Sequence, residues 1–322
     1  MQSSDADVDG APLPGASAAS GTMTRPAHMP IAAVVLIVAA SACFTGIDVT
    51  VKHLSQRYPV PLLVWARWGV QALLMFALLA PTMRWNLVRT TRPGLHLVRG
   101  TVLIASSLCF FSAVKYLPLA EATALNYTSP ILVTLLAGWL LRERITLPRW
   151  GFAAAGFVGM LLIVRPGTRM LDSASLFALA AAAAYASYQI LTRKLAGEDL
   201  RVLLFYPSMC GAVLMSIVVS FYHDDAWYPT SDLALFLGIG VMGSFGHWLF
   251  TRAFRLASAS AIAPFTYVQL VFSTIAAWLL FGTFPDRWAL TGMIVIAGSG
   301  VVLTWYERWR ASLAPAEPAA VD

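Results

Sequence analysis

Two short polar stretches at matching positions are the best candidates for chemistry in this chain. The first reads NYTSP at residues 126–130 and the second reads FTYVQ at residues 265–269, directly after Pro264. Their amides and hydroxyls can hydrogen-bond a polar ligand, and a proline leaves the carbonyl four residues upstream without its usual helical partner. The alternative is polar contact and kinking between packed helices. The matched positions favour binding, with the candidate ligands Asn126, Tyr127, Ser129, Thr266, Tyr267 and Gln269, and with Tyr188 and Gln189 completing the polar lining.

Ionisable residues inside apolar runs are the second set of candidates. Each costs about 2.5–3.5 kcal/mol to insert into lipid, so it normally faces a cavity or a partner. Asp48 with Arg67, and Lys115 with Glu121, can each form a neutral pair. The pairs predict either a gate or ligand clamp, or interfacial salt bridges whose long side chains reach water. His247 can titrate near neutral pH and couple protons, although a role in helix packing is at least as well supported.

The composition of the chain is that of a membrane protein. Of its 322 residues, 58% are hydrophobic and only 12% are charged, and the mean hydropathy is +0.70. Because a soluble domain carries about 25% charged residues, a water-soluble protein and a wholly disordered chain are both excluded. The 22 Lys and Arg exceed the 16 Asp and Glu but form no basic run, so we expect membrane lipid as a partner and no nucleic acid.

Apolar runs of roughly 20 residues follow one another from residue 31 onward. In lipid every backbone polar group must be satisfied within the segment, so each run is expected to form a membrane-spanning helix. The predicted fold is therefore an all-α integral membrane protein with ten transmembrane helices, at residues 31–51, 61–82, 97–116, 119–141, 149–164, 173–192, 202–221, 232–252, 260–282 and 288–306.

The distribution of Lys and Arg predicts the orientation. Fifteen lie on the side that holds both termini, six lie on the other side, and Arg67 lies inside the second span. Because cytoplasmic loops are enriched in these residues, we predict a multi-pass protein of the cytoplasmic (inner) membrane with both termini in the cytoplasm.

The second half of the chain repeats the first. Residues 137–141 (AGWLL) align with 276–280 (AAWLL), and residues 62–63 align with 203–204 at nearly the same offset. Each copy of about 140 residues carries five spans, and because five is odd the second copy must cross the membrane in the opposite sense. Two inverted halves can exchange conformations and expose a central site to each side in turn, which predicts a secondary transporter that works by alternating access.

Three motifs of the first half resemble the EamA-type repeat of the drug/metabolite transporter superfamily. They are LPLAEATA at 117–124, GWLLRER at 138–144 and VRPG at 164–167. The glutamate of the second motif, Glu143, has no counterpart in FGTF at 281–284. We interpret it as an end-cap or salt-bridge residue.

The resemblance implies two inverted five-helix repeats, at residues 30–167 and 172–308. A disordered cytoplasmic tail at 1–29 and a cytoplasmic tail at 309–322 would flank them. The family carries many unlike solutes, so its name does not identify one.

The expected solute is a small polar or zwitterionic metabolite, amino-acid-like, nucleoside-like or vitamin-like, carried in either direction by a monomer or homodimer. The alternative is a polytopic membrane enzyme acting on a lipid-borne substrate. His247 is the one histidine in the middle of a span, and Cys43, Cys109 and Cys210 lack a CxxC spacing, so neither a catalytic triad nor a metal set is expected. We expect no cofactor and no metal.

Overall fold

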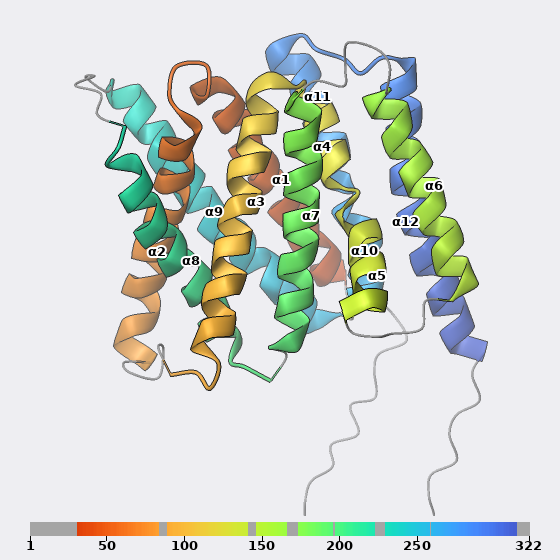
Figure 1. The fold of residues 1–322 in the computed structure, drawn as a ribbon, viewed down its shortest axis with the longest axis horizontal. Helices are drawn as coiled ribbons and strands as arrows, with labels where there is room; N and C mark the ends of the chain where they lie inside the picture. Colours follow the sequence, from red (N-terminus) through yellow and green to blue (C-terminus); the bar gives the residue numbers. More distant parts are fainter. Residues whose placement is uncertain are drawn as a thin grey trace, which may run out of the picture.

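The computed structural model describes residues 31–83, 89–140, 146–165, 173–195, 197–222, 229–257 and 259–313. In these ranges the chain forms α-helices and no strand (Figure 1). Glu143, predicted as an end-cap or salt-bridge residue, and the predicted tail at residues 1–29 lie outside the described residues. The helices are α1 (Ile31–Leu54), α2 (Val60–Met83), α3 (Pro93–Tyr116), α4 (Leu119–Asn126), α5 (Ser129–Leu140), α6 (Leu147–Val164), α7 (Ser173–Lys194), α8 (Leu200–Val219), α9 (Thr230–Leu256), α10 (Ala259–Thr266), α11 (Val268–Phe281) and α12 (Arg287–Leu313).

The helices account for the ten predicted spans. Among the described residues, nine helical segments are long and apolar enough to cross a membrane. The predicted fourth span is divided into α4 and α5, of 8 and 12 residues, so neither piece is long enough alone. The predicted ninth span is also divided, into α10 and α11, but residues 264–281 across this break are one of the nine segments. The prediction of an all-α membrane fold is confirmed.

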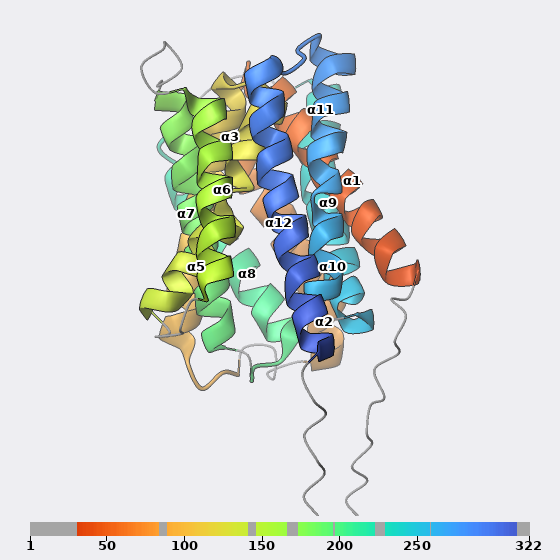
Figure 2. The same ribbon diagram turned by 90° about the vertical axis from the view of Figure 1, so that its right-hand side faces the viewer.

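The two halves of the bundle run in opposite directions. In Figure 1, α1 begins and α12 ends at the lower end of the bundle, and Figure 2 shows the same from a second side. The first helix of the first half, α1, therefore runs upward, whereas the first helix of the second half, α7, runs downward (Figure 1). We name the lower end and the upper end of the bundle as they lie in Figure 1.

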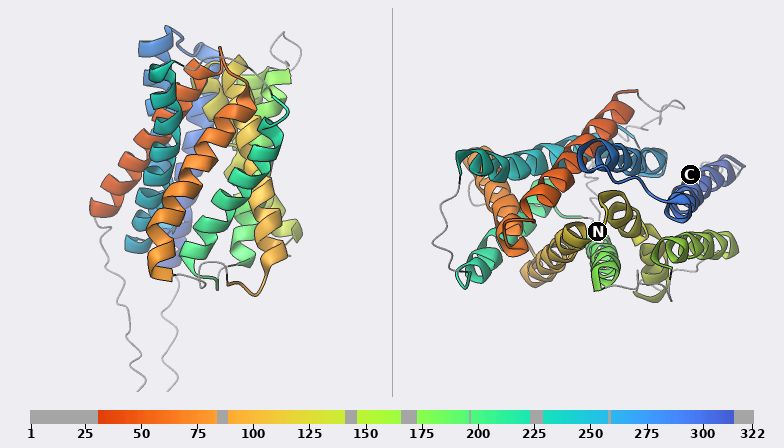
Figure 3. Two further views of the ribbon diagram at one scale, coloured as in Figure 1. Left: turned by 90° about the vertical axis from the view of Figure 1, so that its left-hand side faces the viewer. Right: turned by 90° about the horizontal axis from the view of Figure 1, so that it is seen from above.

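Packing between the halves follows the same inverted symmetry. The third helix of the first half, α3, packs along the first helix of the second half, α7, and the equivalent pair α1 and α9 packs in the same way. The pairs α2 with α8 and α6 with α12 each join a helix to its own repeat equivalent. Seen from above in Figure 3, α6 and α12 lie together at one edge of the bundle.

Glycines allow α6 and α12 to approach closely. A Cβ added to Gly159 would lie 2.8 Å from the carbonyl oxygen of Gly292, and one added to Gly292 would lie 2.5 Å from that of Gly159. Small residues permit such contact between helix backbones in lipid, where no hydrophobic driving force brings helices together. The two halves are thereby held in backbone contact beside the broken helices.

Candidate functional site

The two broken spans are interrupted at the two predicted polar stretches. Helix α4 ends at Asn126 and α5 begins at Ser129, while α10 ends at Thr266 and α11 begins at Val268. In the first break, the carbonyl of Leu125 accepts from the hydroxyl of Thr128 at 2.7 Å and from the backbone N–H of Thr128 at 3.1 Å, instead of the N–H four residues on. Discontinuous helices at matching positions of inverted halves are where carriers of this architecture form their binding sites.

The breaks contact each other through two tyrosines. The rings of Tyr127 and Tyr267 lie with their centroids 5.2 Å apart and tilted by 36°. The Tyr127 hydroxyl lies 2.6 Å from the carbonyl oxygen of Thr266 and 3.2 Å from the amide oxygen of Gln269. A single side chain of the first half thus closes on the broken helix of the second half. The structure brings these four predicted ligands into contact, and their role in binding stays a prediction.

Gln269 connects this contact to a buried carboxylate. Its amide nitrogen donates to Asp48 Oδ2 at 3.2 Å, and Asp48 is only 5% exposed. The predicted partner Arg67 interacts with Asp48 electrostatically. Its guanidinium carbon lies 5.0 Å from the ring centroid of Trp68 and 5.6 Å from that of Phe111. Asp48 therefore interacts with the base in the bundle interior but accepts its hydrogen bond from the amide of Gln269.

Several polar atoms around this acid and base are buried without a hydrogen-bond partner. Buried polar groups are nearly always hydrogen-bonded in folded proteins, so a cluster of exceptions needs an explanation. Sequence reasoning missed Thr45 and Gln71, although Thr45 lies three residues before Asp48 and Gln71 lies four residues after Arg67, on the same helix faces. The unpartnered atoms include Thr45 Oγ1, Arg67 Nε, Trp68 Nε1, Gln71 Oε1, Asn126 Oδ1 and His247 Nε2.

His247 lies near the buried base, next to an aromatic ring. Its ring makes an edge contact with Phe44, with centroids 5.2 Å apart. Its Nε2 is buried without a hydrogen-bond partner and can therefore bind a polar ligand. The proton-coupling role of His247 stays a prediction.

The predicted lining residues of α7 have a different role. Tyr188 accepts a hydrogen bond from Arg99 Nη2 at 2.9 Å, and the guanidinium stacks 4.6 Å from its ring centroid. Gln189, beside it, is half-buried. It is Tyr185, stacked on Tyr188 at 5.7 Å, that interacts electrostatically with Arg67. Sequence reasoning missed Tyr185, which lies one helical turn before Gln189.

The predicted pair of Lys115 and Glu121 is wrong. Lys115 Nζ lies over the ring of Tyr116, whereas Glu121 interacts electrostatically with Arg165 and Asp286. The α4 helix begins directly after Pro118, and its first turn directs Glu121 toward the α6 and α12 ends.

Ion pairs join the two halves at the upper end of the bundle. Arg165 bonds both carboxylate oxygens of Asp286, and Asp286 also accepts from the backbone N–H of Ala289 at 2.9 Å. These bonds to Asp286, which lies outside the spans, lower the pKa of its carboxyl, with the Arg165 bond as the largest cause. On the other side of the upper end, Asp232 accepts from the Tyr58 hydroxyl at 2.7 Å and pairs with Arg57 at 3.6 Å.

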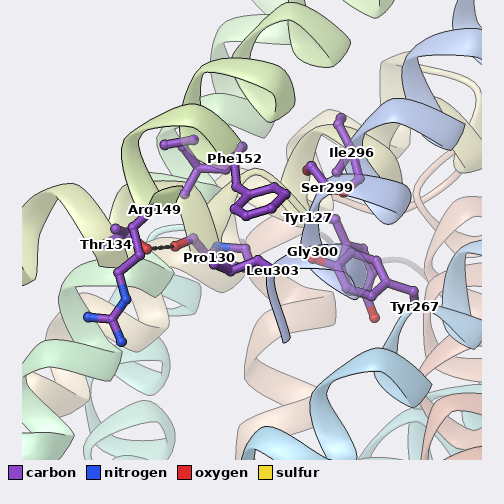
Figure 4. A pocket seen from close by; sticks show the side chains of 12 residues that line it. Tyr127, Pro130, Thr134, Arg149, Phe152, Tyr267, Ile296, Ser299, Gly300 and Leu303 are labelled. Atoms are coloured by element: carbon purple, nitrogen blue, oxygen red, sulfur yellow. Dashed lines mark hydrogen bonds between the residues drawn. The ribbon is translucent and has the colours of Figure 1, made fainter. Parts of the chain in front are cut away.

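A cavity of about 40 Å³ lies below the tyrosines, between α5, α6 and α12 (Figure 4). Its walls include Tyr127 and Tyr267 at one end, and Arg149, near the lower end of α6, at the other. This volume holds only a few water molecules. The cavity lies between Arg149 and the tyrosines of the broken helices, and neither Asp48 nor Arg67 lines it.

The described residues contain no group of three or more His, Cys, Asp or Glu that could hold a metal ion. The polar groups near the breaks are instead a carboxylate, a guanidinium, two amides, an imidazole and tyrosine hydroxyls. Such a set can bind a polar organic molecule through several hydrogen bonds at once.

Known relatives are transporters. One named as an S-adenosylmethionine uptake transporter, of Rickettsia conorii, is 30% identical over 226 residues, which are 69% of this chain and 76% of that protein. One named as a riboflavin transporter, of Vibrio cholerae, is 26% identical over 87% of this chain and 95% of that protein. One named as the pseudopaline exporter CntI, of Pseudomonas aeruginosa, is 29% identical over 84% of this chain and 95% of that protein.

A solved crystal structure shares the fold, with a TM-score of 0.58 at 19% identity over 84% of this chain and 98% of that chain. The EamA-like transporter family matches residues 31–165 and 172–306, which are the two inverted halves. The chain belongs to the EamA-like transporter family and is a small-metabolite transporter.

Proposed function

We propose that the protein is a secondary transporter in which a small polar metabolite binds where the two broken helices meet. The contact of Tyr127 with Thr266 and Gln269 is the observation that carries the proposal, because it joins the two halves at the helix breaks. Asn126 Oδ1, buried without a partner in the first break, offers a further acceptor to the solute. Moving one half against the other would open this contact and release the solute.

The two ends of the bundle support alternating access. At the upper end, Arg165 with Asp286 and Tyr58 with Asp232 hold the halves together. The cavity that reaches the tyrosines lies toward the lower end. The solute would therefore exchange with the lower side in this conformation, and breaking the upper contacts would expose the site to the other side.

Lys and Arg are enriched on the side of the chain that holds both termini, which is the lower side. Because cytoplasmic loops are enriched in these residues, the lower side corresponds to the cytoplasm and the membrane to the cytoplasmic membrane. Fluorescent tags on the two ends of the chain test this orientation. Both tags should report the cytoplasm. Tags on opposite sides would contradict the inverted arrangement of the halves.

The relatives suggest the first solutes to test. Uptake of S-adenosylmethionine, uptake of riboflavin and export of pseudopaline are functions named for relatives at 26–30% identity. The purified chain in liposomes loaded with unlabelled solute should accumulate the labelled solute by saturable counterflow. The solute should be recovered chemically unchanged, because we propose no enzymatic step. Conversion of the solute would favour the alternative of a membrane enzyme, and flux that never saturates would indicate a channel.

Two variants test the site. Asn126→Ala and Gln269→Ala should each reduce counterflow at least tenfold, because each removes a polar group at the breaks. Thr274→Ala is the matched control on α11, since the Thr274 hydroxyl bonds the carbonyl of Leu270 in its own helix at 2.7 Å. Normal counterflow by both site variants would refute the proposed site.

A further inference from the structure

One arginine with a strained backbone joins the two halves at the upper end of the bundle (Figure 1). Arg165 follows α6 of the first half and bonds both carboxylate oxygens of Asp286, which precedes α12 of the second half. Among the described residues it is the one non-glycine residue with a positive φ, of 45°, and Pro166 follows it in the sequence. Such a conformation is disfavoured for residues with a side chain and persists only where surrounding contacts impose it. The strain therefore favours movement of Arg165 once its bond to Asp286 is broken.

A buried carboxyl group lies beside this ion pair. Glu121, in the first turn of α4, is 8% exposed and interacts electrostatically with both Arg165 and Asp286. Helix α4 contacts α6 and α12, whose upper ends the ion pair joins. No described residue donates a hydrogen bond to the carboxyl group of Glu121. A buried carboxylate without a partner is costly unless it carries a proton.

The other charges on the helices around α4 are engaged elsewhere. Lys52 of α1 donates to two carbonyl oxygens at the end of α3, at 2.8 and 3.1 Å. Lys115 of α3 and Arg287 of α12 each lie over the aromatic ring of the next residue. The described parts of α7 and α11 carry no charged residue near the upper end. Arg165 is therefore the base with which Glu121 interacts.

We propose that Glu121 carries a proton while the upper end is closed, and that it releases this proton and takes Arg165 from Asp286 when the upper end opens. Arg165 and Glu121 belong to the first half, so they stay together when the halves part and Asp286 moves away. The proton enters water on the upper side, and the new carboxylate of Glu121 pairs with the guanidinium. Opening releases one proton, so acid on the upper side favours closure. The inference rests on the proposed function, because it takes the upper contacts as a gate of alternating access.

The reactivity of a buried cysteine measures the opening of the upper end. Ala174, in the first turn of α7, is 2% exposed, so a cysteine placed there should react with a thiol reagent when the upper end opens. The three native cysteines are first replaced by serine. Rates are measured from about pH 8 to about pH 5, where Asp286 stays ionised because the Arg165 bond lowers its pKa.

The comparison with Glu121→Gln isolates the proposed proton. Because both proteins carry the same cysteine, the ionisation of the thiol cancels when the wild-type rate is divided by the Glu121→Gln rate. This ratio should fall toward one as pH falls, by up to tenfold per pH unit. Glu121→Asp should keep the pH dependence. Glu198→Gln is the matched control at the lower end, where Glu198 accepts from the Thr90 hydroxyl at 2.8 Å, and it should behave like the wild type.

Two further measurements test whether Asp286 and Glu121 share one arginine. In the Asp286→Asn background, Arg165 has Glu121 as its acid in both conformations, so adding Glu121→Gln should leave the reaction rate of the cysteine unchanged. Infrared spectra at about pH 7 should show the carbonyl band of a protonated carboxyl group, weaker in Glu121→Gln by one group. The infrared measurement needs no engineered cysteine.

The proposal has clear contrary results. A rate ratio that does not change with pH, additive effects of Glu121→Gln and Asp286→Asn, or an infrared band that Glu121→Gln leaves unchanged would each overturn it. None of these measurements needs a solute. Absence of saturable counterflow would refute the proposed function, whereas a failure here would leave a carrier whose upper end opens independently of pH.

Discussion

The closest contact at the site joins Tyr267 to Gly300 on α12, and it predicts a sharp effect of one methyl group. A Cβ at Gly300 would overlap the hydroxyl and the ring of Tyr267. Gly300→Ala must therefore displace the ring that packs on Tyr127 and forms one end of the cavity. Inserting a methyl into a packed interior costs about 1–3 kcal/mol. If that cost falls on the binding arrangement, counterflow should drop by about 5- to 150-fold.

Gly298 is the matched control, two residues earlier on the same helix. A Cβ at Gly298 would meet no atom within 4 Å. Gly298→Ala should transport normally, and its greater helix propensity can stabilise α12 by up to about 1 kcal/mol. Counterflow in liposomes and thermal unfolding in detergent measure the two effects separately.

Combining Gly300→Ala with the second-site change Tyr267→Phe tests the predicted clash more directly. The Tyr267 hydroxyl is the atom nearest to the added Cβ of Gly300→Ala. Its removal should therefore restore part of the lost counterflow. The reasoning is refuted if Gly300→Ala transports like the wild type, or if Gly298→Ala impairs transport to the same extent.

Three further predictions concern the ends and seams of the bundle. Asp286→Asn keeps a cap for α12 but loses the ion pair with Arg165. Losing an exposed ion pair worth about 0.2–1 kcal/mol should let an engineered cysteine at the upper end react with a thiol reagent about 1.4- to 5-fold faster. An unchanged reaction rate would show that the pair does not hold this end. Because the pKa of Asp286 is lowered, the stability that the pair contributes is present above the ordinary carboxyl pKa of about 4 and is lost as pH falls through the lowered value; melting of the wild type and Asp286→Asn should therefore converge in acid. Gly159→Ala should lower the unfolding midpoint because α6 and α12 must separate, whereas Gly151→Ala, with no atom within 4 Å, should not.

The polar stretches could be located from sequence because both copies interrupt an apolar run at the same place. Each stretch contains or follows a proline, and the interruption falls at Tyr127 and Tyr267, where the structure breaks both spans. The direct bond from Tyr127 to Gln269 could not be deduced, because it depends on how the halves are placed in space.

Side-chain partners are harder to predict than helices. Lys115 and Glu121 are close in sequence, yet a turn after Pro118 separates their directions, so adjacency is a poor guide. Arg99 lies near the start of the predicted span 97–116, where a charged side chain would be expected to reach water, but it is 1% exposed and bonds Leu203 and Tyr188 inside the bundle. A helix period fixes the face on which a residue lies, whereas the neighbour that meets this face depends on tertiary packing.

The upper and lower ends differ where α6 meets α12, and this difference explains the position of the cavity. At the upper end the two helices are held by the charged pair of Arg165 and Asp286. At the lower end, near the repeat-equivalent positions, Phe152 and Tyr306 make an aromatic contact with centroids 6.4 Å apart. The ion pair to both carboxylate oxygens constrains distance and direction, whereas the aromatic contact is a packing contact without a charge. Inverted halves of the same fold can thus favour one conformation because a few side chains at one end are charged, and solute binding at the centre need only offset that small bias.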